Sequence, residues 1–100
     1  MSEYFTYLAR CSDNSLYAGY CRDVHAREQK HNSGEGAKYT RSRRPVKIVY
    51  CERFLDRSEA MKRESQIKGW TRQEKENLIQ HGKINPKNGR MILIFKNSPF

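Results

Sequence analysis

The sequence predicts a small α+β domain in which helices flank a short, mostly antiparallel sheet of three strands. The chain has 100 residues, which is enough for one domain with a modest core. Two strand-like segments are joined by a tight turn, a pattern typical of an antiparallel hairpin. The remaining segments give the order β-β-α-β-α-α, which favours helices packed around the sheet.

The first two strands are expected at residues 4–10 and 16–20, which read "YFTYLAR" and "LYAGY". Aromatic residues are frequent in both segments, as is usual for strands. The intervening "CSDNS" contains Asp and Asn, which tolerate the left-handed backbone of a tight turn. We therefore expect a hairpin that places Tyr7 and Tyr17 on neighbouring strands.

A helix, a loop and a third strand are expected next. Asp23 can cap a helix that runs to about His31, and Gly34 stops it. Residues 32–45 contain two glycines, a proline and a cluster of Lys and Arg, so we interpret them as a loop. The segment "VKIVYCERF", residues 46–54, has partly alternating apolar residues and is expected to be a strand.

Two further helices and a tail complete the predicted domain. "DRSEAMKRESQIKGW" is expected to be a helix capped by Asp56 or Ser58, and "TRQE" matches a capping box that opens a helix ending near Gly82. Residues 1–82 are therefore expected to form the domain, and residues 83–100 a C-terminal extension. Within that extension, "MILIF" is either an added strand or an apolar anchor against the core or a partner.

The composition favours a polyanionic partner. The formal net charge is +9, from 20 basic and 11 acidic residues, and such an excess attracts nucleic acid or an anionic membrane surface. No apolar run approaches the ~20 residues that span a bilayer, and the first residues do not resemble a signal peptide. Three widely spaced cysteines fit reduced thiols better than a disulfide framework, so we expect a cytoplasmic protein without a membrane partner.

Several residues can carry phosphate chemistry, and each also has a purely structural interpretation. Arg27 and His31 lie four apart, so they project from one side of the helix and offer a forked cation and a proton relay. An ordinary solvated helix has the same composition. Tyr7 and Tyr17 either fill a strand face or place a phenol near a cation that favours its anion.

Glu64 interrupts the side of the second predicted helix that should face the sheet. A carboxylate there is costly to bury unless it is paired or coordinates a metal. The structural alternative is that Glu64 forms a salt bridge with an arginine or reaches solvent.

The loop "GEGAKYTRSRRPVK" combines glycines, cations and one aromatic residue. Glycines let a backbone approach a phosphate, and cations release counterions when they bind nucleic acid. Tyr39 among them is suited to stacking on a base of a single-stranded or unpaired segment. A solvated basic loop is the alternative, but the charge of the whole chain favours nucleic-acid contact by Lys38, Tyr39, Arg41, Arg43 and Arg44.

These residues, in this order, resemble the GIY-YIG nuclease superfamily over residues 4–80, and within it the small single-domain bacterial branch (UPF0213-like). The resemblance rests on an ordered set: Tyr7, Tyr17, Gly19, Arg27, His31, "GAKYT" and Glu64. Two departures stand out. Phe5 replaces the glycine of the first triplet, and Lys38 or Tyr39 must serve where other branches have a second histidine or a lysine.

The resemblance implies a metal-dependent endonuclease that hydrolyses DNA phosphodiester bonds. One divalent cation, Mg²⁺ or Mn²⁺, would be held by Glu64 and waters. Tyr17 or Tyr7 would activate the attacking water, Arg27 would bind the transition state, and His31 would orient a group or relay a proton. Gly19 would let the hairpin approach the substrate backbone.

Substrate choice is expected to follow DNA structure, single-stranded or branched, because nothing outside the predicted core is long enough to read bases in the major groove. DNA repair, recombination or another form of DNA processing fits this expectation, with a protein partner supplying further specificity. The alternatives are a non-catalytic nucleic-acid-binding module and a basic adaptor that docks through "MILIF".

Overall fold

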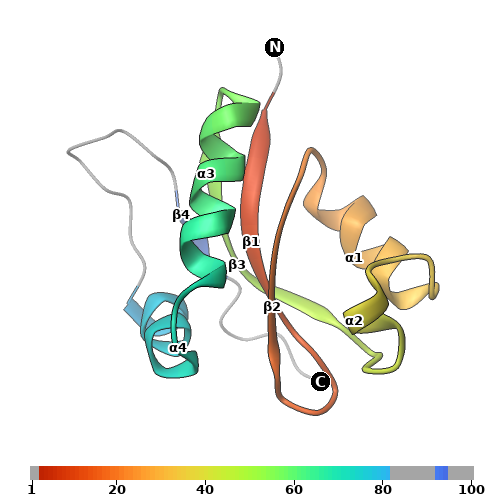
Figure 1. Ribbon diagram of the computed structural model, residues 1–100. Coiled ribbons are helices and arrows are strands. Elements are labelled where there is room, and N and C mark those ends of the chain that lie inside the picture. Colours follow the sequence, from red (N-terminus) through yellow and green to blue (C-terminus); the bar gives the residue numbers. More distant parts are fainter. Residues whose placement is uncertain (1–2, 82–91, 95–100) are drawn as a thin grey trace.

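The fold is described here from a computed structural model, which places residues 3–81 and 92–94 (Figure 1). Among these residues there are four strands in one antiparallel sheet of order β2-β1-β3-β4. The strands are β1 (Tyr4–Arg10), β2 (Leu16–Cys21), β3 (Lys47–Phe54) and β4 (Ile92–Ile94). The helices are α1 (Val24–Asn32), α2 (Lys38–Arg41), α3 (Arg57–Lys68) and α4 (Arg72–His81). The predicted α+β class and the antiparallel arrangement of the first three strands are confirmed.

The β1–β2 hairpin forms where it was expected. Its turn is closed by a 2.9 Å hydrogen bond from the Cys11 amide to the Ser15 carbonyl, and Asn14 adopts the left-handed φ of 70°. The register places Tyr7 opposite Gly19 and Ala9 opposite Tyr17. Because side chains two apart point to the same face of a strand, Tyr7 and Tyr17 share one face of the sheet.

The α1 helix begins and ends close to the predicted residues, but the segment after it differs from the prediction. Asp23 caps α1 by accepting a 3.0 Å hydrogen bond from the Ala26 amide. The expected loop at residues 32–45 contains the four-residue helix α2, which corrects that prediction. The Ala37 carbonyl accepts from the amides of Thr40 and Arg41, and the fully buried Thr40 side chain holds this turn against α1. A tertiary contact therefore overrides the weak helix propensity of a glycine-rich segment.

Both later helices begin at the predicted caps. Asp56 accepts a 2.9 Å hydrogen bond from the Ser58 amide at the start of α3. Thr71 and Glu74 form a reciprocal capping box at the start of α4, with distances of 2.9 and 3.2 Å. Arg10 then fixes α4 against β1 through two hydrogen bonds to the Glu76 carboxylate, of 2.8 and 2.7 Å.

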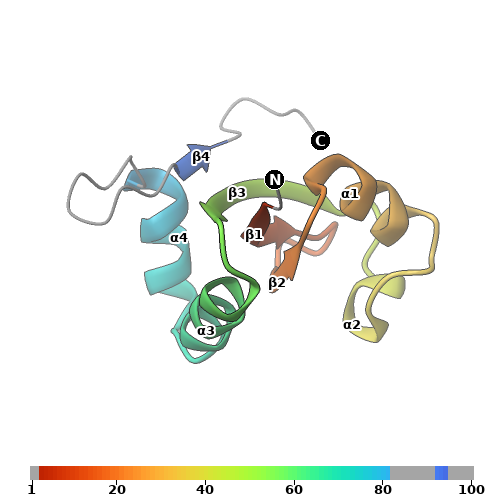
Figure 2. The ribbon, with the colours of Figure 1, turned by 90° about the horizontal axis from the view of Figure 1, so that it is seen from above.

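The two helix pairs lie on either side of the sheet (Figure 2). The α1–α2 side covers a cluster that contains Tyr7, Ala9, Cys11, Cys21, Val46, Ile48 and Cys51. The α3–α4 side covers a second cluster of Leu8, Ala18, Tyr50 and Ile67, with Trp70, Leu78 and Ile79 packed against it. Because β2 is an edge strand, side chains of α1 and α3 can both reach it.

The predicted C-terminal extension lies outside the described residues, apart from Ile92–Ile94. That segment pairs with β3, with Ile94 opposite Tyr50, and so corresponds to the added-strand alternative. No helix within residues 3–81 combines the length and apolar character needed to cross a membrane. The three cysteines are free and buried, as expected for reduced thiols.

Candidate active site

A chain of buried hydrogen bonds links β1, α1 and α2. The Tyr7 hydroxyl lies 2.7 Å from His31 Nε2, and His31 Nδ1 lies 2.9 Å from Thr40 Oγ1. Thr40 Oγ1 in turn lies 2.9 Å from the Ala37 carbonyl oxygen. These contacts assign the protons, because a carbonyl can only accept. The Thr40 hydroxyl donates to Ala37, so it accepts from Nδ1–H, and Nε2 accepts from the Tyr7 hydroxyl.

Burial keeps the two rings in this series of hydrogen bonds, Tyr7 and His31, neutral. Tyr7 and His31 are each 1% exposed. Burial lowers the pKa of His31 below its ordinary 6.5, and the nearby Arg27 guanidinium lowers it further. Burial raises the pKa of Tyr7 well above 10, although Arg27 opposes this rise. At neutral pH, therefore, a neutral phenol donates to a neutral imidazole.

Tyr17 is the more accessible tyrosine of the pair. Its ring lies edge-on to His31, with centroids 5.6 Å apart, and 6.4 Å from the Tyr7 ring. Its other neighbour is Tyr39 of α2, whose ring stacks at 6.0 Å with an interplanar angle of 22°. Arg43 lies 3.9 Å over the Tyr39 ring and pairs with Asp13 in the hairpin turn at 3.0 Å. These contacts hold the segment that contains α2 against the hairpin.

Tyr17, Arg27 and His31 open onto one pocket of about 300 Å³, which Lys30, Glu35, Gly36 and Ala37 complete. Arg27 is half-buried, and its guanidinium donates a 3.3 Å hydrogen bond to the Tyr20 carbonyl. Gly36 makes room for the histidine, because a Cβ there would lie 2.5 Å from His31 Nδ1. The pocket thus exposes a forked cation beside a phenol, which is suited to binding a phosphate.

Glu64 approaches Tyr17 from the other side of β2. Its side chain is 17% exposed, and Oε2 lies 3.6 Å from Lys68 Nζ on the next turn of α3. Lys68 Nζ in turn lies 5.9 Å from the centre of the Tyr17 ring. The carboxylate and the phenol therefore both lie near Lys68, although Glu64 is on a different helix from Arg27 and His31 and is not among the described residues that line the pocket.

The side chains near the pocket fit a hard cation that takes few of its ligands from the protein. No group of three or more His, Cys, Asp or Glu side chains gathers anywhere within residues 3–81 and 92–94. Glu64 offers a half-buried carboxylate near Tyr17, and Glu35, which lines the pocket, offers an exposed one. Mg²⁺ commonly keeps several waters and binds one or two carboxylates together with substrate phosphates. One half-buried carboxylate near Tyr17, which lines the pocket, fits that small protein contribution.

Gly19 is constrained by the protein itself. A Cβ at this position would lie 2.5 Å from the Tyr7 hydroxyl oxygen and 2.6 Å from Tyr7 Cζ, closer than real side chains approach. The space beside Gly19 is therefore filled by the Tyr7 ring. This packing explains why a glycine follows Tyr17 by two residues on the paired strand.

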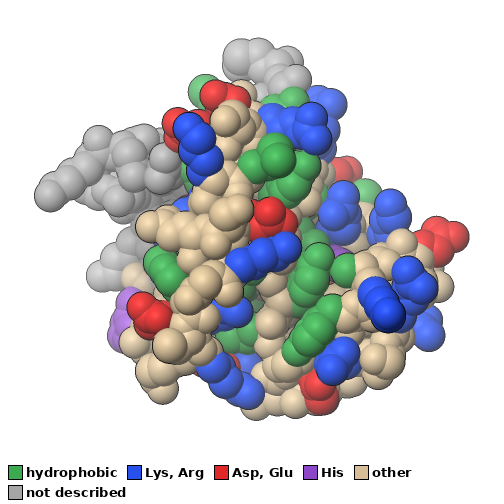
Figure 3. All heavy atoms as spheres, viewed as in Figure 1, with side chains coloured by type: hydrophobic (Ala, Val, Ile, Leu, Met, Phe, Trp, Pro, Cys, Tyr) green, Lys and Arg blue, Asp and Glu red, His purple; other side chains and the backbone are tan. Residues whose placement is uncertain are grey.

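The predicted basic loop forms an exposed surface beside the pocket. Figure 3 shows Lys and Arg side chains gathered over α1 and α2. Lys38, Tyr39, Arg41 and Arg44 are exposed, whereas Arg43 is half-buried against Tyr39. Arg41 and Arg44 donate to carbonyls of their own segment, at Gly36 and at Arg41.

Four residues were not found by sequence reasoning. Thr40 completes the histidine chain, Lys68 joins Glu64 to Tyr17, and Glu52 and Arg63 form a buried ion pair beneath α3 with distances of 2.9 and 2.8 Å. Thr40 lies in the quoted "GAKYT", and Glu52 interrupts an apolar strand, so both left a signal. Lys68 and Arg63 left none, because lysine and arginine are ordinary on a helix surface.

Comparisons with known proteins agree on one family. Residues 3–77 match the GIY-YIG catalytic domain. A UPF0213 protein of Staphylococcus epidermidis is 55% identical over 82 residues, covering 82% of this chain and 100% of the relative. A UPF0213 protein of Staphylococcus aureus is 56% identical over 80 residues, covering 80% and 98%.

Two solution NMR structures are similar as well. The UPF0213 protein of Bacillus halodurans is 42% identical with a TM-score of 0.51, covering 78% of this chain and 83% of its own. A protein from E. faecalis is 43% identical with a TM-score of 0.55, covering 80% and 85%.

Proposed function

The chain belongs to the family of GIY-YIG catalytic domains, and on this premise we propose that it is a metal-dependent endonuclease that hydrolyses DNA phosphodiester bonds. One observation carries the proposal: Tyr17, Arg27 and His31 line one pocket, and Lys68 of α3 lies near both Tyr17 and the Glu64 carboxylate. A cation and a phenol that line one pocket, with a carboxylate that can hold a metal ion nearby, are groups that phosphodiester hydrolysis uses.

Arg27 would bind the phosphate whose bond is broken. Negative charge grows on the phosphate oxygens as water attacks, and a guanidinium already held by the Tyr20 carbonyl stabilises that charge without rearranging. The fork of the guanidinium matches two oxygens of one phosphate, which a lysine would not match.

Tyr17 would contact the attacking water. It lines the pocket, whereas Tyr7 is 1% exposed and already donates its proton to His31. As the new P–O bond forms and the P–O3′ bond breaks, the phenolate form of Tyr17 would take the water proton, and the leaving 3′ oxygen would take a proton from solvent. Tyr17 is therefore the proposed catalytic tyrosine.

His31 and Tyr7 would act as positioning residues. Both ring nitrogens of His31 already have protein partners, so the imidazole cannot take a proton from water directly. The chain from Tyr7 through His31 to Thr40 fixes the wall on which Tyr17 and Arg27 lie.

Glu64 would hold one Mg²⁺ or Mn²⁺ ion together with waters. When bound, such an ion supplies a Lewis acid for a non-bridging phosphate oxygen and for the leaving 3′ oxygen. Lys68 would release Glu64 for this role, since an ion pair of 3.6 Å between partly exposed groups is weak.

The substrate is proposed to be single-stranded or branched DNA, contacted by Lys38, Tyr39, Arg41, Arg43 and Arg44. The net charge of +9 and the exposed cations beside the pocket support this substrate. DNA repair, recombination or processing is the proposed setting, with a protein partner adding specificity. The free buried thiols support a cytoplasmic location.

The proposal is tested by cleavage of a panel of labelled substrates. The protein is incubated with single-stranded, duplex and branched DNA, and with single-stranded RNA, in Mg²⁺, Mn²⁺ or EDTA. Cleavage is expected with metal and DNA, and it should fall at least a hundredfold in Glu64→Ala, Arg27→Ala and Tyr17→Phe. Equal cleavage by the parent and all three variants would show that this pocket is not the active site.

The non-catalytic alternatives predict a different result from the same panel. A binding module would retain DNA with a steep salt dependence and cut nothing under any metal. A basic adaptor would bind DNA weakly and co-elute with a protein through "MILIF". If the purified parent protein binds DNA tightly but cleaves none of the substrates, the nuclease proposal is replaced by the proposal of a binding module.

A further inference from the structure

A second pocket lies on the other side of Arg27. It has a volume of about 420 Å³, and its lining contains three arginines, two tyrosines and a cysteine: Tyr4, Tyr20, Cys21, Arg22, Arg27 and Arg57. No acidic side chain is among these described lining residues. Because Arg27 lines both pockets, an anion here would be a neighbour of the phosphate in the first pocket.

The arginines of this second pocket are held in place by its tyrosines. Arg57 of α3 donates a 3.2 Å hydrogen bond to the Tyr20 hydroxyl, and its guanidinium lies 6.0 Å from the Tyr20 ring centre. Arg22, which follows β2, lies 5.3 Å over the Tyr4 ring. These contacts aim two forked cations at one space before any ligand arrives, which reduces the entropy lost on binding.

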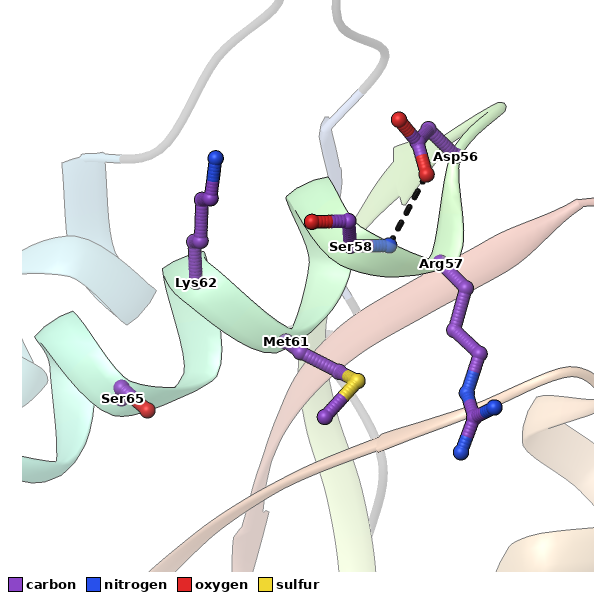
Figure 4. Close-up of a pocket in the computed structure, with 6 residues that line it drawn as sticks. All are labelled: Asp56, Arg57, Ser58, Met61, Lys62 and Ser65. Carbon is purple, nitrogen blue, oxygen red and sulfur yellow. Dashed lines mark hydrogen bonds between the residues drawn. The ribbon is translucent and has the colours of Figure 1, made fainter.

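One stripe of α3 runs from Arg57, which lines the second pocket, to Lys68, which lies near Tyr17. Arg57, Met61, Glu64 and Lys68 are spaced by four, three and four residues, so they lie on one side of the helix. Figure 4 shows Arg57 and Met61 pointing toward β2, whereas Lys62 points away. The stripe is about 16 Å long at 1.5 Å per residue. Glu64 therefore lies between a cation near Tyr20 and a cation near Tyr17.

We propose that the second pocket, formed by Arg22, Arg57, Tyr4 and Tyr20, is a subsite for a phosphate that flanks the scissile phosphate of the nucleic acid. The inference rests on the proposed function, because it takes the first pocket as the place of cleavage. A strand lying along β2 would present one phosphate to Arg27 and a neighbouring phosphate to Arg57. The subsite gives the enzyme affinity on one side of the cut without reading bases.

A phosphate on the cleaved strand and a phosphate on the opposite strand of a duplex have the same chemistry. We assign the subsite to the cleaved strand, because both pockets adjoin the same edge strand, β2, and share Arg27. The experiment therefore replaces single phosphates by neutral methylphosphonates, one position at a time, on either strand.

The matched pair of variants is Arg57→Gln and Lys62→Gln, made in Glu64→Ala so that binding is measured without cleavage. Each removes one positive charge from α3, but Lys62 points away from β2. Affinity for a single-stranded oligonucleotide is expected to fall about tenfold in Arg57→Gln and less than twofold in Lys62→Gln. The slope of log K against log salt should fall by about one in Arg57→Gln.

The decisive readout is non-additivity with phosphate neutralisation. One methylphosphonate beside the scissile position should lower the affinity of the Glu64→Ala protein for the oligonucleotide about tenfold. The same methylphosphonate should have little further effect on the affinity of the protein that also carries Arg57→Gln. The subsite would be overturned if the affinity losses from Arg57→Gln and from the methylphosphonate multiplied at every position. It would also be overturned if the only sensitive phosphate lay on the opposite strand of a duplex. Failure of the parent to bind any nucleic acid would instead remove the proposed function itself.

Discussion

Two buried tyrosines, one on each face of the sheet, have opposite surroundings. Tyr7 faces α1 and donates to the neutral ring of His31, which opens onto the pocket. Tyr50 faces α3 and donates at 2.6 Å to Glu52, a carboxylate whose two oxygens also accept from Arg63. Burial raises the pKa of both tyrosines, but Glu52 adds to the rise at Tyr50, whereas Arg27 opposes it at Tyr7.

The comparison separates a polar network whose charges cancel internally from one that adjoins the proposed site. On the α3 face every partner is a protein group and the charges cancel within the network, so its main consequence is stability. On the α1 face the network ends beside Arg27, a cation that lines two pockets. Burial of polar groups alone therefore does not mark the proposed site, and the α1-face network differs in that the neighbouring Arg27 lines the pocket of Tyr17 and His31.

The largest expected effect falls on the α3 face. Arg63→Met would leave the Glu52 carboxylate, 2% exposed, without its cation, and should cost about 3–5 kcal/mol of unfolding free energy in urea denaturation. Adding Glu52→Gln should recover most of that loss, because the neutral amide still accepts from Tyr50. A loss below about 1 kcal/mol in the single variant would show that the pair is solvated.

On the α1 face the expected effect is on activity. Arg27→Ala should lower the cleavage rate about 10²- to 10³-fold, or about 2.7–4 kcal/mol of transition-state stabilisation, and change unfolding by about 1 kcal/mol. Lys62→Ala is the control, because it removes a cation that points away from β2. If Arg27→Ala lost stability and activity in proportion, the two faces would not differ as described.

Gly19→Ala tests the packing of Tyr7. The new methyl group would lie 2.5 Å from the Tyr7 hydroxyl, so the ring must move, at a cost of about 1–3 kcal/mol. Gly69→Ala is the matched control, because its methyl group would meet Gln66 at an ordinary 3.6 Å. Equal stability of the two variants in thermal unfolding would contradict the close approach.

The smallest effect is the pH dependence of the α1 face. The pKa of His31 is lowered in the folded protein, so the unfolded chain binds more protons as the pH falls below about 6.5. This contribution to stability is complete above that pH and is lost below it, by at most about 1.4 kcal/mol per pH unit. His31→Gln should therefore flatten the dependence between pH 7 and pH 5, measured by urea denaturation.

The control for that measurement is His25→Gln on the exposed side of α1, which should keep the slope of the parent. If stability depended on pH as steeply in His31→Gln as in the parent, another group would be responsible. Glu76 and Asp13 are the candidates, because their pKa values are also lowered and their contributions to stability are lost at lower pH.

Much of the fold could be predicted from the sequence because its signals are local. The caps at Asp23 and Asp56, and the capping box of Thr71 and Glu74, lie within a few residues of the groups they bond. The hairpin turn likewise needs only Asp and Asn at neighbouring positions. The predicted neighbourhood of Tyr7 and Tyr17 followed from this turn and is confirmed by the register.

The rest depends on contacts between distant segments. The α2 helix forms where Thr40 reaches His31 on α1, and although "GAKYT" carries the family resemblance, helix propensity and periodicity do not predict that contact. Lys68 meets Tyr17 only because β2 is an edge strand beside α3. The sequence resemblance named Tyr7, Arg27, His31 and Glu64, but the proton assignment and the separation of the two tyrosines needed the geometry.

The different anchoring of His31 and Glu64 has a consequence for divergence within this family. Tyr7 and His31 belong to the core, so substitutions of these residues would destabilise the fold whether or not the protein needs them for catalysis. Glu64 lies on a helix surface with Lys68 as its ion-pair partner, so it can be lost at little cost to the fold. If the proposed activity is correct, a descendant that loses it should therefore keep Tyr7 and His31 for longer than Glu64.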